Sequence, residues 1–135
     1  MLNRKAAREQ AFILIFEKIF NDLSCGEIID LAVSVREFET DDYCVGVFTG
    51  VYDNIEQIDA LIGENSNGWS VSRISKVSLA VMRLAVYELL FREDIPASVS
   101  VNEAVELCKK FASAEDAAFV NGVLGTIVKK VAADK

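Results

Sequence analysis

The segment that most constrains the fold is residues 76–91, KVSLAVMRLAVYELLF, in which only a few polar groups interrupt an apolar run. A helix that is apolar on nearly every side is buried, and other helices pack around it. The run is too short, and too often interrupted by charge, to span a bilayer. Because Pro96 disfavours helix at the residue before it, we expect the helix to end ahead of that point. The segment therefore predicts a central, buried helix.

Two further helices are expected after it. Ser100 and Glu103 have the spacing of a capping box, which predicts a helix start at Ser100. The apolar residues that follow recur at helical spacing, and they are Val101, Ala104, Val105, Cys108, Phe111 and Ala112. After a break at 112–114, Glu115 and Asp116 suit the positive end of a last helix.

The first half of the chain also reads as helical. Asn3 predicts the N-cap of a helix over residues 4–20, and Ser24 that of a short helix over 27–35. A third helix is expected from Thr40 to Ile62, with Gly50 marking a kink or a close packing point. The clearest loop, 65–68, divides two helical halves. Trp69 and Ile74 are expected in a short helix that leads into the buried one.

Composition agrees with one helical domain. The chain has 135 residues, 52% hydrophobic content and a single proline, so it can bury a core and is built for helices rather than strands and turns. We expect an all-α single domain over 1–135, with an N-terminal half at 1–64 and a C-terminal half at 69–135.

The chain lacks the residue that most often serves as a general base in enzymes. The chain has no histidine, and Cys25, Cys44 and Cys108 have no metal-binding spacing, which predicts reduced cysteines in a cytoplasmic protein. It has no phosphate-binding loop and no dinucleotide-binding motif. The basic N-terminus lacks the pattern of a secretory signal. We expect neither catalysis nor a cofactor or metal.

Charge is distributed unevenly. The net charge of −7 argues against nucleic acid as a partner, but residues 17–64 alone carry −10, while 1–16 carry +2 and 65–135 carry +1. The excess of acid is thus confined to the middle of the chain. A basic surface on the first helix remains open.

That first helix has a basic and aromatic stripe. Arg4, Arg8, Phe12 and Phe16 follow one another at i+4 spacing, and Lys5 lies beside them. Basic side chains neutralise phosphates, and aromatic rings stack on unpaired bases. The alternative is a solvated helix start above a buried aromatic, and Phe12 fits the core better than a site. Basic residues at a helix N-terminus oppose its dipole, which hints at a functional reason for them.

Other polar residues have structural interpretations. Asn102, Glu103 and Glu106 lack a nucleophile or base partner, so capping and solvent exposure explain them. Arg83 on the buried helix needs a partner within the fold. Asn121 and Gly122 are expected to satisfy a helix end and to allow a close helix contact.

Three segments together resemble one family. MRLAVYELLFREDIP (82–96), VNEAVELCKKF (101–111) and FVNGVL (119–124) resemble the transcription antitermination factor NusB in order and spacing, and RKAAREQAFILIF (4–16) is similar to its arginine-rich first helix. The resemblance implies about seven helices in two packed halves. It also implies a non-catalytic factor in transcription antitermination and rRNA transcription that binds boxA-like RNA with the small-subunit ribosomal protein NusE, and joins RNA polymerase with NusA and NusG.

The resemblance also implies site residues. The RNA-binding positions it indicates are Arg4, Lys5, Arg8, Phe16, Asp116 and Phe119. The chain departs from the family's pattern in four places: alanines interrupt the arginine cluster, Phe16 replaces a tyrosine, an alanine precedes Phe119 and Gly125 replaces an acidic residue. For the protein partner we expect docking on the C-terminal half, at Lys76, Ser78 and Met82.

Two alternatives remain open. The acidic composition favours a helical interaction module, such as a homodimer, that does not itself bind RNA. Salt-dependent RNA binding would distinguish the two functions. A third interpretation is the NusB-like domain that precedes RNA methyltransferase domains, and a chain ending at Lys135 leaves no room for the catalytic part.

Overall fold

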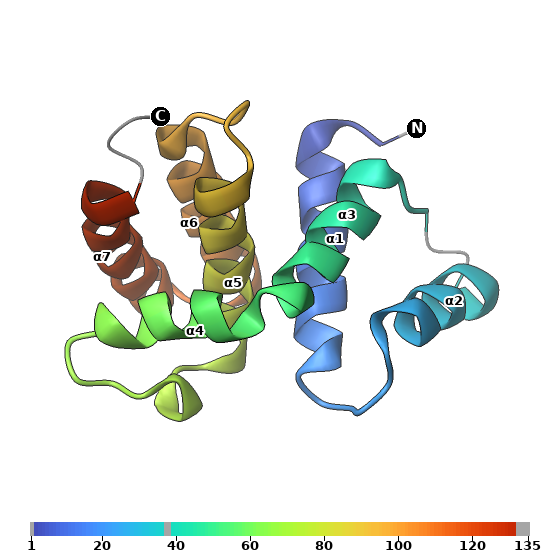
Figure 1. Cartoon of the computed structure of the whole chain (residues 1–135), viewed down its shortest axis with the longest axis horizontal. Coiled ribbons are helices and arrows are strands. Elements are labelled where there is room, and N and C mark those ends of the chain that lie inside the picture. Colours follow the sequence, from blue (N-terminus) through green and yellow to red (C-terminus); the bar gives the residue numbers. More distant parts are fainter. Residues whose placement is uncertain (1, 37–38, 132–135) are drawn as a thin grey trace.

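The fold is arranged around α5 (Lys76–Phe91), in a computed structural model that describes residues 2–36 and 39–131 (Figure 1). Ten of the residues of α5 are buried, and the helix packs against α1, α3, α4, α6 and α7. Its Ser75 N-cap accepts a hydrogen bond from the backbone N–H of Ser78 at 3.2 Å. The expected central buried helix is confirmed, with the expected bounds.

Side-chain caps start the first three helices, α1 (Arg4–Lys18), α2 (Cys25–Arg36) and α3 (Asp42–Asp53). Asn3 Oδ1 accepts from the N–H of Ala6 at 2.7 Å, as predicted. Ser24 and Glu27 form a capping box, since each side chain accepts from the other's backbone N–H at 3.1 Å. The cap at Ser24 is confirmed, and α2 begins at Cys25, two residues before the expected start.

The single helix expected up to Ile62 is wrong, because the chain turns at Asn54 into a separate helix, α4 (Ile55–Glu64). The Asn54 amide Nδ2 donates to the carbonyl of Gly50 at 2.8 Å, and its own N–H donates to the same carbonyl, which ends α3 there. Gly50 is a close packing point, as expected. A Cβ placed on it would lie 2.6 Å from Cζ of Tyr87 on α5.

The loop after α4 contains the two positive φ angles of the described backbone, 50° at Asn67 and 86° at Gly68. A short 3-10 turn, η1 (Val71–Arg73), then leads into α5. Trp69 and Ile74 flank this turn rather than lying within it. Trp69 is exposed, whereas Ile74 is buried.

The last two helices are α6 (Ala97–Phe111) and α7 (Ala114–Val131). The expected start of α6 at Ser100 is wrong, because the helix begins directly after Pro96. Ser100 is instead buried inside the helix, and its hydroxyl donates to Glu88 Oε1 at 2.8 Å. The structural roles expected for Asn121 and Gly122 are also wrong, because both residues are exposed and no atom lies within 4 Å of a Cβ on Gly122.

Figure 1 shows α5, α6 and α7 side by side, with α1 and α3 next to them and α2 at the far edge. The described residues contain seven α-helices and no strand, which confirms the all-α class. α4 crosses the C-terminal helices and contacts α5 and α7 as well as α3. The division of the domain into halves at 1–64 and 69–135 stays a prediction. Within the described chain, no helix has the length and apolarity that a membrane crossing requires.

Candidate functional site

The predicted stripe on α1 divides into exposed and buried parts. Arg4 and Lys5 are exposed on its first turn, and Phe16 is half-buried near its end. Phe12 belongs to the hydrophobic core, which confirms the expectation that it is a core residue rather than a site residue. Arg8, expected on the surface, is only 4% exposed. The stripe therefore presents Arg4, Lys5 and Phe16 to solvent, while Arg8 points into the protein.

Arg8 is held by a buried carboxylate. Its Nε donates to Glu88 Oε2 at 2.9 Å, and the Tyr43 hydroxyl donates to the same oxygen. Burial is the largest single influence on the pKa of the Arg8 guanidinium and lowers it, but the combined effects of Glu88, Tyr43 and Glu103 are larger, and the net shift is upward. Burial, followed by the nearby Glu88 charge, raises the pKa of Tyr43 well above its usual value. Arg8 is thus engaged in a buried charge network.

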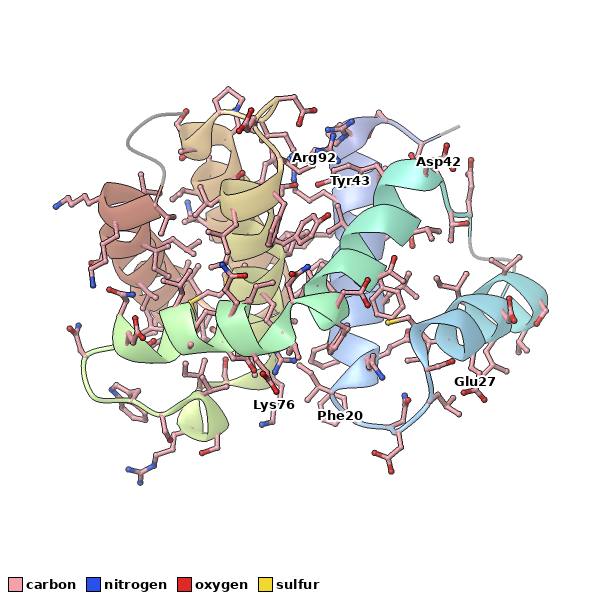
Figure 2. The ribbon with its side chains drawn as sticks, in the orientation of Figure 1. Phe20, Glu27, Asp42, Tyr43, Lys76 and Arg92 are labelled. Carbon is pink, nitrogen blue, oxygen red and sulfur yellow. The ribbon has the colours of Figure 1, made fainter. Side chains whose placement is uncertain are left out.

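A basic cluster forms at the start of α1 around the ring of Tyr43. The guanidinium carbon of Arg4 lies 4.1 Å from the ring centroid, and that of Arg92 lies 5.2 Å from it. Figure 2 shows Arg92 beside Tyr43, between the end of α5 and α1. Arg92 also makes a two-bond contact with Asp94 at 2.8 and 2.9 Å, and this pairing lowers the pKa of Asp94 to about 2. Sequence reasoning missed Arg92, because it lies 88 positions from Arg4.

A groove of about 180 Å³ separates α1 from α6. Two ion pairs cross it. Lys5 Nζ lies 3.7 Å from Glu103 Oε2, and Lys110 Nζ lies 2.9 Å from Glu9 Oε1. The groove therefore carries both signs of charge, and its two lysines are positioned by carboxylates on the opposite helix.

Aromatic rings connect the end of α6 with α1. The ring centroids of Phe111 and Phe12 are 5.1 Å apart, and those of Phe12 and Phe16 are 6.1 Å apart. Phe20 follows at 5.0 Å from Phe16 and lies at the foot of α1 in Figure 2. Phe16 is thus one ring in a row whose two ends, Phe111 and Phe20, are exposed.

Asp116 and Phe119 lie at the start of α7. The Asp116 carboxylate accepts hydrogen bonds from the hydroxyls of Ser113, Ser75 and Ser78 at 2.9 to 3.3 Å, so it joins the starts of α5 and α7. Phe119 lines an open groove of about 350 Å³ together with Trp69, Arg73, Ile74, Ser75, Glu115 and Asp116.

Trp69 is a site candidate that sequence reasoning did not single out. The residue is 53% exposed at the rim of that groove, and the Arg73 guanidinium carbon lies 5.9 Å from its ring centroid. The sequence signal that could have indicated it is a lone tryptophan directly after the polar loop 65–68 and four positions before Arg73.

Of the three positions expected to contact a protein partner, one is exposed and two are buried. Lys76 is exposed at the start of α5. Ser78 and Met82 are buried, at 1% and 0% exposure, so the prediction that they contact a partner is wrong. The reason is that α5 is covered on nearly every side, which its apolar sequence already indicated.

The described residues hold no group of three His, Cys, Asp or Glu side chains that could bind a metal ion. The three cysteines are free thiols. Cys44 and Cys108 are buried, and burial raises the pKa of Cys44 to about 12 and that of Cys108 to about 11. Arg83 has the partner that was expected, since it donates to both carboxylate oxygens of Asp59 at 2.8 and 2.9 Å.

Comparison with known proteins identifies the family. The model of the NusB family matches residues 5–129. The transcription antitermination protein NusB of Acetivibrio thermocellus is 43% identical over 130 residues, which cover 95% of this chain and 90% of that protein. The structure of T. maritima NusB superposes with a TM-score of 0.83 at 31% identity, covering 96% of this chain and 92% of that one.

A second solved structure is described as the antitermination factors NusB and NusE in complex with double-stranded RNA. Its matching chain gives a TM-score of 0.83 at 29% identity, with 93% of this chain and 96% of that chain covered. The family model and the relatives span nearly the whole sequence, and the chain belongs to the NusB family.

Proposed function

We propose that this protein is a non-catalytic RNA-binding factor in transcription antitermination. The observation that carries the proposal is the exposure of Arg4 and Lys5 on the same helix as Phe16, in a chain whose net charge is −7. Phosphate neutralisation and base stacking need these two kinds of side chain. The solved complex of NusB and NusE with RNA supports the same role.

In this proposal the RNA strand has two contact regions. Arg4 and Lys5 meet phosphates, with Arg92 completing the basic cluster, and Phe16 stacks on a base. The groove lined by Phe119 and Trp69 takes a second base, and Asp116 positions the groove by joining α5 to α7. Arg8 contributes indirectly, because its ion pair with Glu88 fixes the orientation of α1.

The proposed partners follow from the family. The RNA is boxA-like, as in rRNA leaders, and the protein partner is the small-subunit ribosomal protein NusE. The complex of the two then joins RNA polymerase with NusA and NusG. Of the three positions expected for NusE, only Lys76 is exposed, so we place the contact there. Titration calorimetry of Lys76→Glu against NusE tests this position, and an unchanged affinity would place the contact elsewhere.

The central experiment measures RNA affinity at a series of salt concentrations. The variant Arg4→Ala/Lys5→Ala should bind a boxA-like RNA more weakly, and the log–log salt slope should fall by roughly 0.7 for each phosphate that the protein no longer neutralises. Its matched control is Lys109→Ala/Lys129→Ala, which removes two exposed lysines on α6 and α7. The control should retain both affinity and slope.

The interaction-module alternative makes the opposite prediction. If the protein binds no RNA itself, the wild type alone shows no salt-dependent RNA affinity, and adding it to NusE does not change the RNA affinity of NusE. A double variant that keeps the wild-type affinity and slope, while the wild type binds, would move the RNA site away from α1.

A further inference from the structure

α2 has a sequence suited to the interior, although it lies at the surface. Its apolar residues cover more than half of the helix circumference, and Gly26, Glu27, Asp30 and Ser34 occupy the remaining side. The apolar residues are Cys25, Ile28, Ile29, Leu31, Ala32, Val33 and Val35. An apolar surface of this width exceeds the stripe that a surface helix normally packs against a core. Here only Ile28 and Ala32 are buried. The rest of the apolar surface of α2 is at least partly open to solvent.

The open part is concentrated on this one helix. Leu31 is 50% exposed, Val33 46% and Val35 71%, and these are three of the eight large hydrophobic side chains exposed in the described chain. Leu31 and Val35 are four residues apart, so they lie on the same side of α2 and form a strip, called here the α2 strip. α2 packs against α1 and α3 at the edge of the molecule, away from α6 and α7 (Figure 1).

The charge around the α2 strip indicates which kind of partner covers it. Glu27 and Asp30 are exposed on the same helix, and Asp42 is exposed at the start of α3 (Figure 2). The whole segment 17–64 carries −10. RNA phosphates and anionic lipid headgroups are repelled by such a surface, and a second copy that paired through its own α2 would bring the same negative charge. A basic protein surface is complementary to it.

We propose that the α2 strip binds a basic amphipathic helix of another protein. Apolar residues of that helix pack on Leu31 and Val35, and its Lys or Arg residues face Glu27 and Asp30. This is the mode in which an amphipathic helix lays its apolar face on an apolar surface. The proposal uses none of the residues assigned to RNA or to NusE, so a test of it does not depend on whether the proposed function is correct.

The probe is a synthetic leucine–lysine peptide of about 14 residues, with leucines at helical i, i+3, i+4 and i+7 spacing. Its counterpart has glutamate at every lysine position. Binding is followed by NMR of the full-length protein, which reports both affinity and the amides that shift. We expect the lysine peptide to shift amide signals of α2 and to bind about tenfold or more tightly than the glutamate peptide.

Two variants separate the apolar and the charged contributions. Leu31→Gln/Val35→Gln removes the strip without adding charge, and it should weaken binding of the lysine peptide about tenfold. Glu27→Gln/Asp30→Asn should also weaken binding and should reduce its salt dependence, while a glutamine in place of Glu27 preserves the capping box with Ser24. The matched control is Val99→Gln, at another exposed valine, which should bind like the wild type.

Three results would overturn the proposal. The two peptides could bind equally well, or the shifted amides could lie outside α2. The wild type could form a dimer in sedimentation experiments that Leu31→Gln/Val35→Gln dissociates, in which case a second copy covers the strip. Circular dichroism of every variant confirms the fold, and the charge variant tests the proposal even if the glutamine variant unfolds.

Discussion

Arg8 and Glu88 lie 80 positions apart in the chain and form an ion pair of 2.9 Å whose side chains are only 5% and 1% exposed. Glu88 also accepts hydrogen bonds from Tyr43 on α3 and Ser100 on α6. One carboxylate on α5 therefore holds α1, α3 and α6. Two charges buried together tolerate the loss of either partner poorly, since the remaining charge is left in an apolar surrounding.

Arg8→Ala should therefore act on stability. We expect a loss of about 3–5 kcal/mol in the free energy of unfolding, measured by urea denaturation. Lys129→Ala, an exposed control, should change it by no more than about 0.5 kcal/mol. At temperatures where Arg8→Ala stays folded, its RNA salt slope should equal that of the wild type. A reduced slope with unchanged stability would mean that Arg8 contacts phosphate directly.

Trp69→Ala and Phe119→Ala test the groove at the start of α7. Each should reduce RNA affinity by roughly 1–3 kcal/mol, because a base can no longer stack there, without changing the salt slope. Trp69 is 53% exposed, so its removal should leave the melting temperature nearly unchanged. The control is Phe91→Ala, which removes another exposed aromatic ring. If Trp69→Ala and Phe119→Ala bind RNA as tightly as the control Phe91→Ala, the groove is not part of the RNA site.

Gly50→Ala and Gly122→Ala should have opposite effects on stability. A Cβ on Gly50 would lie 2.6 Å from Cζ of the Tyr87 ring, so we expect a loss of about 1–3 kcal/mol in the free energy of unfolding. Gly122 has open space around it, and alanine there should gain up to about 1 kcal/mol of helix propensity. In a double-mutant cycle, adding Tyr87→Leu should recover part of the free energy of unfolding that Gly50→Ala loses. Purely additive effects would contradict the steric explanation.

The buried thiols predict a loss of stability in alkaline solution. The pKa of Cys44 is raised to about 12 and that of Cys108 to about 11 by burial, above their ordinary value. The unfolded chain therefore ionises first, so stability is intact below about pH 8 and falls as the pH rises from about 9 towards 11 and 12. Urea denaturation at stepped pH measures this, and Cys44→Ala/Cys108→Ala should flatten the decline. An identical decline in the variant would assign the effect to other groups.

Local signals in the sequence predicted much of the fold. The caps at Asn3 and Ser24 and the bounds of α5 depend on neighbouring residues, and the structure confirms them. The break at Asn54 was missed because the apolar spacing continues through it. Ser100 was misread because its distance from Glu103 matches a capping box, whereas its actual partner is Glu88 on another helix.

The sequence predicted which helices carry the candidate site, but not which of their side chains are exposed. Helical spacing placed Arg4 and Arg8 on one stripe of α1. It could not show that α5 covers Arg8, one turn after Arg4, and pairs it with Glu88. Ser78 and Met82 were assigned to a partner on the resemblance, against the apolar pattern that buries them. Arg92 and Trp69 join the candidate surface only through tertiary contacts.

The ring contact between Phe12 on α1 and Phe111 at the end of α6 has a consequence for ligand length. Phe111 is followed after two residues by α7, so the two proposed RNA contact regions belong to one connected frame. If RNA contacts both regions, we expect the frame to act as a bivalent receptor towards one strand, because the second contact would form at the effective concentration set by the first. A strand long enough to reach both regions gains this advantage, and an oligonucleotide that reaches only one has none of it.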